Sequence, residues 1–211
     1  MGSPPNSTLF SRRAAGLASI TASGLILLYQ LSQIIFVLTV SESFFHATQS
    51  LRFGLALVAM YVLLLALTGL YWVEANVVGG LGLAGYLIAF LGTLLVAGDW
   101  WYETFIGPIL RDRVPELLEE AQPGLVLFGA FVTSAAFAVG WLIFGLSSYR
   151  TGIFPRGASI LLMLGGVAGA VPLLVGSQIP LALAVGWMGS SLIRSASREL
   201  QPSRLSAPTI K

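Results

Sequence analysis

The chain has 211 residues, of which 56% are hydrophobic and 9% charged, and its 11 Lys and Arg against 9 Asp and Glu give a formal net charge of +2. Because soluble globular proteins carry about 25% charged residues, this composition excludes a soluble fold. The absence of cysteine excludes disulfides, thiolate metal sites and dithiol exchange, and a single histidine, His46, cannot build a bis-histidine haem site.

The apolar residues are grouped in long blocks that predict membrane crossings. A helix rises 1.5 Å per residue and the hydrocarbon core is about 30 Å thick, so each crossing needs about 20 mostly apolar residues. In chain order the blocks predict crossings at 14–40, 53–73, 78–98 and 124–148, and a longer block at 157–193. The pentapeptide Gly176-Ser177-Gln178-Ile179-Pro180 divides this last block into two, because glycine commonly ends a helix and proline commonly starts one. The sequence therefore predicts an all-α, polytopic transmembrane helical bundle of six spans.

The first and fifth of these crossings carry features of their own. Arg12 and Arg13 precede the first block as in a signal peptide. The block exceeds the 7 to 15 apolar residues of a typical signal sequence, so we expect an uncleaved span. Pro172 is predicted to kink the fifth helix near its end.

The domain organisation follows from these spans. We expect a cytoplasmic tail at 1–13, a six-helix transmembrane domain at 14–198 and a second cytoplasmic tail at 199–211. The one long connection, 99–122, alternates apolar and charged residues at near-helical spacing. It predicts one or two amphipathic helices in the outer interface, which either cap the bundle or act as a gate or docking element.

The positions of the cations predict the orientation of the chain. With a cytoplasmic amino terminus, the inner segments hold eight cations and the outer segments three. The inner ones are Arg12, Arg13, Arg150, Arg156, Arg194, Arg198, Arg204 and Lys211, and the outer ones are Arg52, Arg111 and Arg113. Because Lys and Arg concentrate in cytoplasmic loops, we expect both termini to be cytoplasmic in a multi-pass protein of the cell membrane.

The strongest candidate for chemistry is the cluster Asp99-Trp100-Trp101-Tyr102-Glu103. If the third helix continues through it, Asp99 and Glu103 share a face at i and i+4. Two neighbouring carboxylates repel each other, which favours a site that exchanges protons or binds a cation. His46, expected in the first outer loop, lies on the same side, although no ligand spacing predicts a metal site. The alternative is an aromatic interfacial belt with acids that are solvated or paired with Arg111 or Arg113.

Gln30 and Gln33 form a polar stripe beside Tyr29 in the first span. Amides exposed to lipid are costly, so we expect the stripe to face other helices or a cavity. Hydrogen bonding between helices and ligand binding are both compatible with this pattern.

Small residues recur at intervals of four, at Ala14, Ala18 and Ala22 in the first span and at Gly165 and Gly169 in the fifth. Such rows let helix backbones approach closely. They predict either packing inside the bundle or a face that receives a partner membrane subunit or a second copy of the chain.

One short internal echo is visible, because Ala138-Val139-Gly140-Trp141 recurs as Ala184-Val185-Gly186-Trp187. Each copy precedes a Ser-Ser pair and an arginine. A duplicated unit would explain the echo, and so would two helices that each need an interfacial Trp, small packing residues and a cytoplasmic Arg.

Two resemblances bear on function. The stretch from Gly140-Trp141 to Gly145, with Tyr149-Arg150-Thr151-Gly152 and Pro155-Arg156, resembles uncharacterised six-span integral membrane proteins of bacteria, which imply an inner-membrane location and no function. The row Ala14, Ala18 and Ala22 on the first of six helices is similar to substrate-binding subunits of energy-coupling-factor vitamin transporters, which dock a partner through alanines so spaced.

Three hypotheses for function follow. The leading one is a non-enzymatic accessory, scaffold or regulatory bundle, and the second is a small-molecule transport subunit. The third is a membrane enzyme that uses the outer acidic cluster, although no complete catalytic constellation is present. We expect no cofactor and, because no basic stretch is interleaved with aromatics, no nucleic-acid partner.

Overall fold

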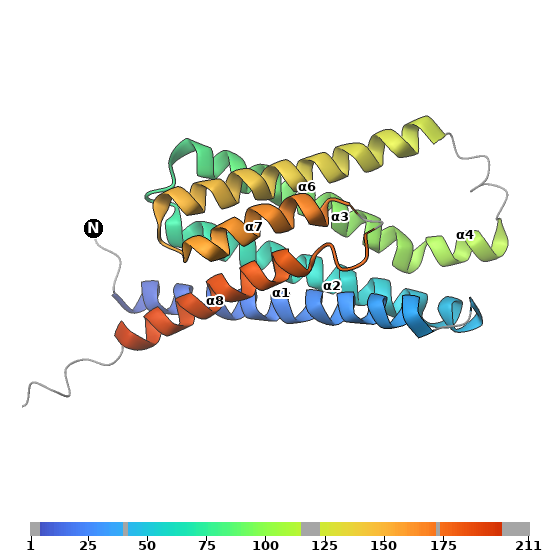
Figure 1. The fold of residues 1–211 in the computed structure, drawn as a ribbon, viewed down its shortest axis with the longest axis horizontal. Coiled ribbons are helices and arrows are strands. Elements are labelled where there is room, and N and C mark those ends of the chain that lie inside the picture. Colours follow the sequence, from blue (N-terminus) through green and yellow to red (C-terminus); the bar gives the residue numbers. More distant parts are fainter. Residues whose placement is uncertain (1–4, 40–41, 115–122, 172–173, 200–211) are drawn as a thin grey trace, which may run out of the picture.

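The structure of the chain is a computed structural model that describes residues 5–39, 42–114, 123–171 and 174–199, without the side chains of 5–10, 39, 42–47, 123 and 199. Its helices are α1 (Pro5–Thr39), α2 (Glu42–Glu74), α3 (Gly79–Phe105), α4 (Gly107–Arg113), α6 (Pro123–Thr151), α7 (Arg156–Gly169) and α8 (Ile179–Glu199) (Figure 1). The described residues contain no strand. The predicted all-α class is confirmed.

Five of the described helices are long and apolar enough to cross a membrane. The crossings would be Ser11–Leu38, Thr48–Glu74, Gly79–Phe105, Gly124–Thr151 and Ile179–Arg198. They overlap the first four predicted crossings and the last one. The remaining predicted crossing corresponds to α7, which has 14 residues and is therefore about 21 Å long. The chain thus has the helices of a multi-pass membrane protein, with one helix shorter than a bilayer.

Helix α7 is short because it ends at Gly169, well before the turn that leads into α8. The helix stops at Gly169, and the chain turns through Gly176, whose φ of +85° is a left-handed conformation that suits glycine. Helix α8 then begins at Ile179. The predicted turn therefore forms where the sequence places it. Pro172, the predicted kink, lies outside the described residues.

The six long and medium helices form a closed ring. Each of α1, α2, α3, α6, α7 and α8 contacts the next in this order, and α8 returns to contact α1. Neighbouring helices run in opposite directions, so the start of α1 and the end of α8 lie at the same end of the molecule (Figure 1). We call this the inner end, and we call the opposite end, where α3 is followed by α4, the outer end.

Glycines bring α3 and α6 into backbone contact along their inner halves. A methyl group on Gly85 would lie 2.6 Å from the backbone nitrogen of Phe144, and one on Gly92 would collide with the backbone nitrogen of Phe137. From the other helix, Gly140 abuts the backbone of Ala89. Because no side chain stands between the helices, their backbones pack directly against each other.

A second seam of small residues joins α1 to α8. A methyl group on Gly189 would lie 2.6 Å from Cβ of Ser19, and one on Gly186 would lie 2.5 Å from Oγ of Ser23. The predicted row beside this seam changes in exposure along the helix, since Ala14 is exposed, Ala18 is half-buried and Ala22 is fully buried.

The core between the helices is filled by large side chains that are fully buried. They include Phe137, Trp141, Phe144, Phe154, Ile26, Met60, Leu63, Leu67, Leu70, Leu162, Leu181 and Met188. Trp141 Nε1 donates a hydrogen bond of 3.1 Å to Thr93 Oγ1, which itself donates to the carbonyl of Ala89. The two tryptophans of the sequence echo therefore differ, because Trp141 is 0% exposed and Trp187 is 46% exposed. The explanation of the echo by two interfacial tryptophans therefore does not hold for Trp141.

Two predicted outer loops are partly helical. Helix α2 begins at Glu42, so His46 belongs to a helix and not to a loop, and its side chain lies outside the described residues. Helix α3 continues to Phe105 and α4 follows directly, so Asp99 and Glu103 lie on one continuous helix. The later part of the predicted outer loop, 115–122, lies outside the described residues.

Candidate functional site

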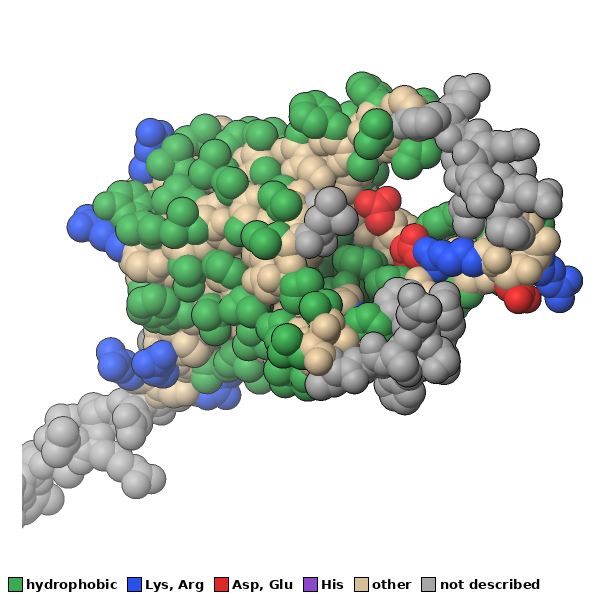
Figure 2. All heavy atoms as spheres, turned by 45° about the vertical axis from the view of Figure 1, so that its right-hand side comes forward, with side chains coloured by type: hydrophobic (Ala, Val, Ile, Leu, Met, Phe, Trp, Pro, Cys, Tyr) green, Lys and Arg blue, Asp and Glu red, His purple; other side chains and the backbone are tan. Residues whose placement is uncertain are grey.

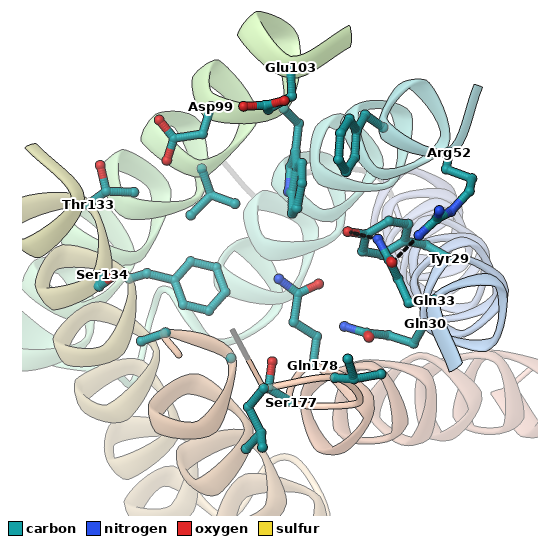
Figure 3. A pocket seen from close by; sticks show the side chains of 18 of the residues that line it. Tyr29, Gln30, Gln33, Arg52, Asp99, Glu103, Thr133, Ser134, Ser177 and Gln178 are labelled. Atoms are coloured by element: carbon teal, nitrogen blue, oxygen red, sulfur yellow. Dashed lines mark hydrogen bonds between the residues drawn. The ribbon is translucent and has the colours of Figure 1, made fainter. Parts of the chain in front are cut away.

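A cavity of about 530 Å³ lies at the outer end, in the centre of the helix ring. This volume is within the range of small-molecule sites, about 300–1,000 Å³. Four long helices form its walls, and the α7–α8 connection forms its floor because this hairpin is shorter than its neighbours (Figures 1 and 3). The lining includes Tyr29, Gln30 and Gln33 of α1; Gln49, Arg52 and Phe53 of α2; Val96, Asp99, Trp100 and Glu103 of α3; Ala130, Thr133, Ser134 and Phe137 of α6; and Gly169, Ala170, Ser177 and Gln178 of the hairpin.

Helical spacing brings these residues to one face of each wall. The lining residues of α3 and of α6 both follow the pattern i, i+3, i+4 and i+7, which is one stripe of an α-helix. The close glycine contacts end at Gly92 on α3 and at Phe137 on α6. The cavity-lining stripe begins one turn outward of Gly92, at Val96, on α3 and at Phe137 itself on α6. The cavity therefore exists because α3 and α6 stop touching outward of this point.

A chain of hydrogen bonds runs along the α1 and α2 side of the cavity. Gln33 Nε2 donates to the hydroxyl of Tyr29 at 2.6 Å, and Arg52 donates to Oε1 of Gln33 (Figure 3). The Arg52 guanidinium also lies 4.0 Å above the ring of Phe36, a cation–π contact. These contacts hold a cation at the wall of the cavity.

Aromatic rings form the next part of the wall. Trp100 stacks on Phe53 with ring centroids 5.2 Å apart, and it meets the edge of Tyr29 at 5.4 Å. Rings packed at these distances and angles stabilise one another beyond their burial alone. The aromatic wall therefore lies directly beside the polar residues.

Gln30 positions the floor. Its Oε1 accepts a 3.2 Å hydrogen bond from the backbone nitrogen of Gly176, so α1 holds the turn of the α7–α8 hairpin. Gln178, on the same turn, is 6% exposed and extends toward Gln30 in the middle of the cavity (Figure 3). The predicted glutamine stripe thus lies at the cavity, where Gln30 has a partner in the turn and Gln33 has one in α2.

Several buried polar atoms at the cavity have no hydrogen-bond partner. Among the described side chains, four buried polar atoms are unpartnered, and three of them belong to lining residues: Arg52 Nε, Trp100 Nε1 and Gln178 Oε1. The fourth is Ser159 Oγ, in α7. Because an unsatisfied buried polar group costs about 1–3 kcal/mol, their concentration at one cavity needs an explanation.

The two predicted acids differ in their surroundings. Glu103 forms an ion pair with Arg111 of α4, whereas the structure gives Asp99 neither an ion pair nor a hydrogen bond among its described residues. Both line the cavity, and Arg111, on the short helix that follows α3 directly, meets Glu103 over Gly107 and neutralises one of the two charges. No three His, Cys, Asp or Glu side chains within the described part of the chain gather as a metal site.

The comparisons with known proteins add nothing to this geometry. No family model, curated protein or solved structure matches the chain. The candidate site is therefore interpreted from its own residues.

The packing residues predicted from small-residue spacing lie at different places. Gly165 abuts the backbone of Leu181 between α7 and α8, and Gly169 lines the cavity next to Phe137 and Gln178. In the alanine row, only Ala14 is exposed.

Three residues at the cavity were not recognised from the sequence. Arg52 was counted only for orientation, Gln178 only as part of a turn, and Gln49 not at all. The signal that would have found them is the one used for Gln30, namely an amide or a charge next to an apolar block.

A separate buried polar cluster lies at the inner end. The carboxylate of Glu74 is fully buried, and it accepts a 2.7 Å hydrogen bond from Ser148 Oγ and a 3.2 Å one from Thr151 Oγ1. It joins the end of α2 to the end of α6. Because its hydrogen bonds join two helix ends, we interpret this cluster as a link between helices.

Proposed function

We propose that the chain is a multi-pass protein of the bacterial cell membrane with six crossings and both termini in the cytoplasm. The closed ring of antiparallel helices and the shared position of the first and last helix ends support an even number of crossings. Most described arginines lie at the inner end, namely Arg12, Arg13, Arg150, Arg156, Arg194 and Arg198, whereas cations and acids lie together at the outer end (Figure 2). An excess of Lys and Arg at one end is what the positive-inside rule places in the cytoplasm.

This topology has a direct test, because the chain has no cysteine of its own. Single cysteines at Ser3 and Ser206 should resist a membrane-impermeant thiol reagent in intact cells and react after permeabilisation. Labelling of both in intact cells would invert the orientation, and labelling of one alone would contradict an even number of crossings.

For molecular function we propose a small-molecule-binding subunit of a transport system. The observation that carries this proposal is the cavity whose lining includes the buried, unpartnered Arg52 Nε, Trp100 Nε1 and Gln178 Oε1. A scaffold or accessory bundle has no need of such atoms, whereas a bound molecule would satisfy them. The cavity therefore favours the transport hypothesis over the accessory one. The proposal does not depend on the alanine row, since Ala22 is buried within the bundle.

The test is whether a molecule occupies the cavity. The protein is purified in mild detergent, and the small molecules and lipids extracted from it are compared by mass spectrometry with those from two variants. Ser134→Phe puts a ring into the cavity, and Val139→Phe adds similar bulk to the exposed face of the same helix. We expect a species that is enriched in the wild type and in Val139→Phe and lost from Ser134→Phe. Equal profiles for all three folded proteins would contradict the proposal.

A further inference from the structure

The cavity continues sideways between α3 and α6. A second hollow of about 520 Å³ lies between the outer halves of these helices and shares Asp99, Glu103, Ala130 and Thr133 with the central cavity. Gly129, which lines this hollow on α6, shows that the helices have separated, because a methyl group on it would meet no atom within 4 Å among the described residues. The central cavity therefore has a lateral opening.

The flank of this opening is apolar and faces outward. The second hollow is lined on α6 by Val126, Phe128 and Val132, and on α3 by Leu95. Beyond it, the outer part of α6 is exposed, with Leu125 at 73% and Phe131 at 71%. In a membrane protein an exposed apolar surface of this kind contacts acyl chains. The lateral opening therefore leads from the cavity to lipid.

The central cavity, into which the opening leads, carries charges of both signs. Figure 2 shows acidic side chains beside the hollow at the outer end, and Figure 3 shows Asp99 and Arg52 on opposite sides of the central cavity. Asp99 has no described cationic partner, and Arg52 keeps Nε free. Gln178 adds a buried, unpartnered acceptor below them. A head group with a cation and an anion would complement this arrangement.

We propose that the ligand is an amphiphile with a zwitterionic head, which carries an ammonium and a phosphate or carboxylate, and with a hydrocarbon tail. The head group enters the central cavity with its anion toward Arg52 and bends back so that its ammonium faces Asp99, and the tail leaves through the opening between α3 and α6 along Val126 and Phe128. This inference rests on the proposed binding function and names its substrate class. The same head chemistry occurs in a membrane lipid and in a free head group, so the test has an arm for each.

The test measures binding of three probes to the purified, delipidated protein by native mass spectrometry and thermal shift. The probes are phosphatidylethanolamine, phosphatidylglycerol, which lacks the ammonium, and free phosphoethanolamine, which lacks the tail. The variants are Asp99→Asn, which removes the charge, and Gly129→Trp, which blocks the opening. Gly124→Trp is the matched control, since it too faces open space but lies outside both hollows.

We expect the wild type to bind phosphatidylethanolamine at least tenfold more tightly than either other probe. Asp99→Asn and Gly129→Trp should each weaken this binding about tenfold, and Gly124→Trp should leave it unchanged.

Three outcomes would overturn the inference. If free phosphoethanolamine binds as tightly as the lipid and Gly129→Trp has no effect, the ligand comes from water and needs no tail. The cavity-filling variant Ser134→Phe is measured as well. If phosphatidylethanolamine binds to Asp99→Asn and to Ser134→Phe as tightly as to the wild type, it is only surface lipid. If no probe binds while Ser134→Phe still removes a co-purified species, the proposed binding function stands and this substrate class is wrong.

Discussion

Helices α3 and α6 pack in two different ways along their length. In their inner halves Gly85, Gly92 and Gly140 bring the two backbones into contact, whereas Gly129 in the outer half of α6 has open space beside it. Glycine therefore does not bring helices together by itself. It permits contact where the opposite helix has a small residue or bare backbone, and outward of Phe137 the two helices are instead separated by the cavity.

The polar groups differ between the two halves in the same way. In the inner half Trp141 donates to Thr93, and in the outer half Trp100 has no partner for its indole nitrogen. The inner half thus has the features of a stable packed core, and the outer half has those of a binding site. The following predictions test this division.

The largest effect should come from alanine at the two kinds of glycine. Gly92→Ala should lower the free energy of unfolding by about 2–3 kcal/mol, because the new methyl group collides with the backbone of Phe137. Gly129→Ala should raise it by about 0.4–1 kcal/mol, since there is room for the methyl group and the unfolded chain loses freedom. Reversible unfolding in mixed micelles measures both. Effects of the same sign and size for both substitutions would contradict the distinction between a packed inner half and an open outer half of the α3–α6 pair.

The next effect concerns Glu74 at the inner end. Glu74→Leu should lower the free energy of unfolding by about 1–3 kcal/mol, because Ser148 and Thr151 lose their shared acceptor in a buried place. Glu74→Gln should cost less, since its amide oxygen still accepts one of these hydrogen bonds. The same unfolding assay compares the two, and a larger loss for Glu74→Gln than for Glu74→Leu would contradict the interpretation as a link between helices.

A smaller effect is expected from the two tryptophans. Trp141→Phe should lower the free energy of unfolding by about 1 kcal/mol, because it removes a buried hydrogen bond to Thr93. Trp100→Phe should change it by less than about 0.5 kcal/mol in delipidated protein, since it removes a donor that has no partner. If Trp100→Phe is the more damaging of the two, its indole nitrogen has a partner in the empty protein.

The smallest effect is expected at the acidic pair. Asp99→Asn, Glu103→Gln and the double variant should each change stability by less than about 1 kcal/mol and combine within about 0.5 kcal/mol of additivity, because Glu103 is already paired with Arg111 at a half-exposed position. A double-variant cycle on thermal unfolding measures this. A coupling clearly above that limit would mean that the two carboxylates act as one unit in the empty protein.

The helices were largely predictable from the sequence, whereas their rotation was not. Block length and the pentapeptide around Gly176 locate the described crossings, since both depend on local chemistry. The burial of Trp141 and the exposure of Trp187 were not predictable, because helices in lipid are apolar all round and hydropathy does not mark the inward face.

The candidate site was predictable in part. The shared face of Asp99 and Glu103 follows from helical spacing, and the alternative of a pair with Arg111 is realised for Glu103 because α4 follows α3 directly and Gly107 leaves room for the two side chains to meet. The cavity itself was not predictable, because it depends on the length of α7 relative to its neighbours and on the separation of two helices that are 18 residues apart along the chain, from Phe105 to Pro123.

The α1–α8 seam that closes the ring also constrains the order of assembly. Helix α8 follows the other described helices along the chain and packs on α1, so the face of α1 that carries Ser19 and Ser23 meets this partner only after α8 has been synthesised. The hydroxyl of Ser19 donates to the carbonyl of Ala15 in its own helix at 2.8 Å. Before α8 packs against it, this hydroxyl on α1 therefore already has a hydrogen-bond acceptor. Ring closure is therefore a late step, and chains that stall before α8 would expose this seam to neighbouring proteins during biosynthesis.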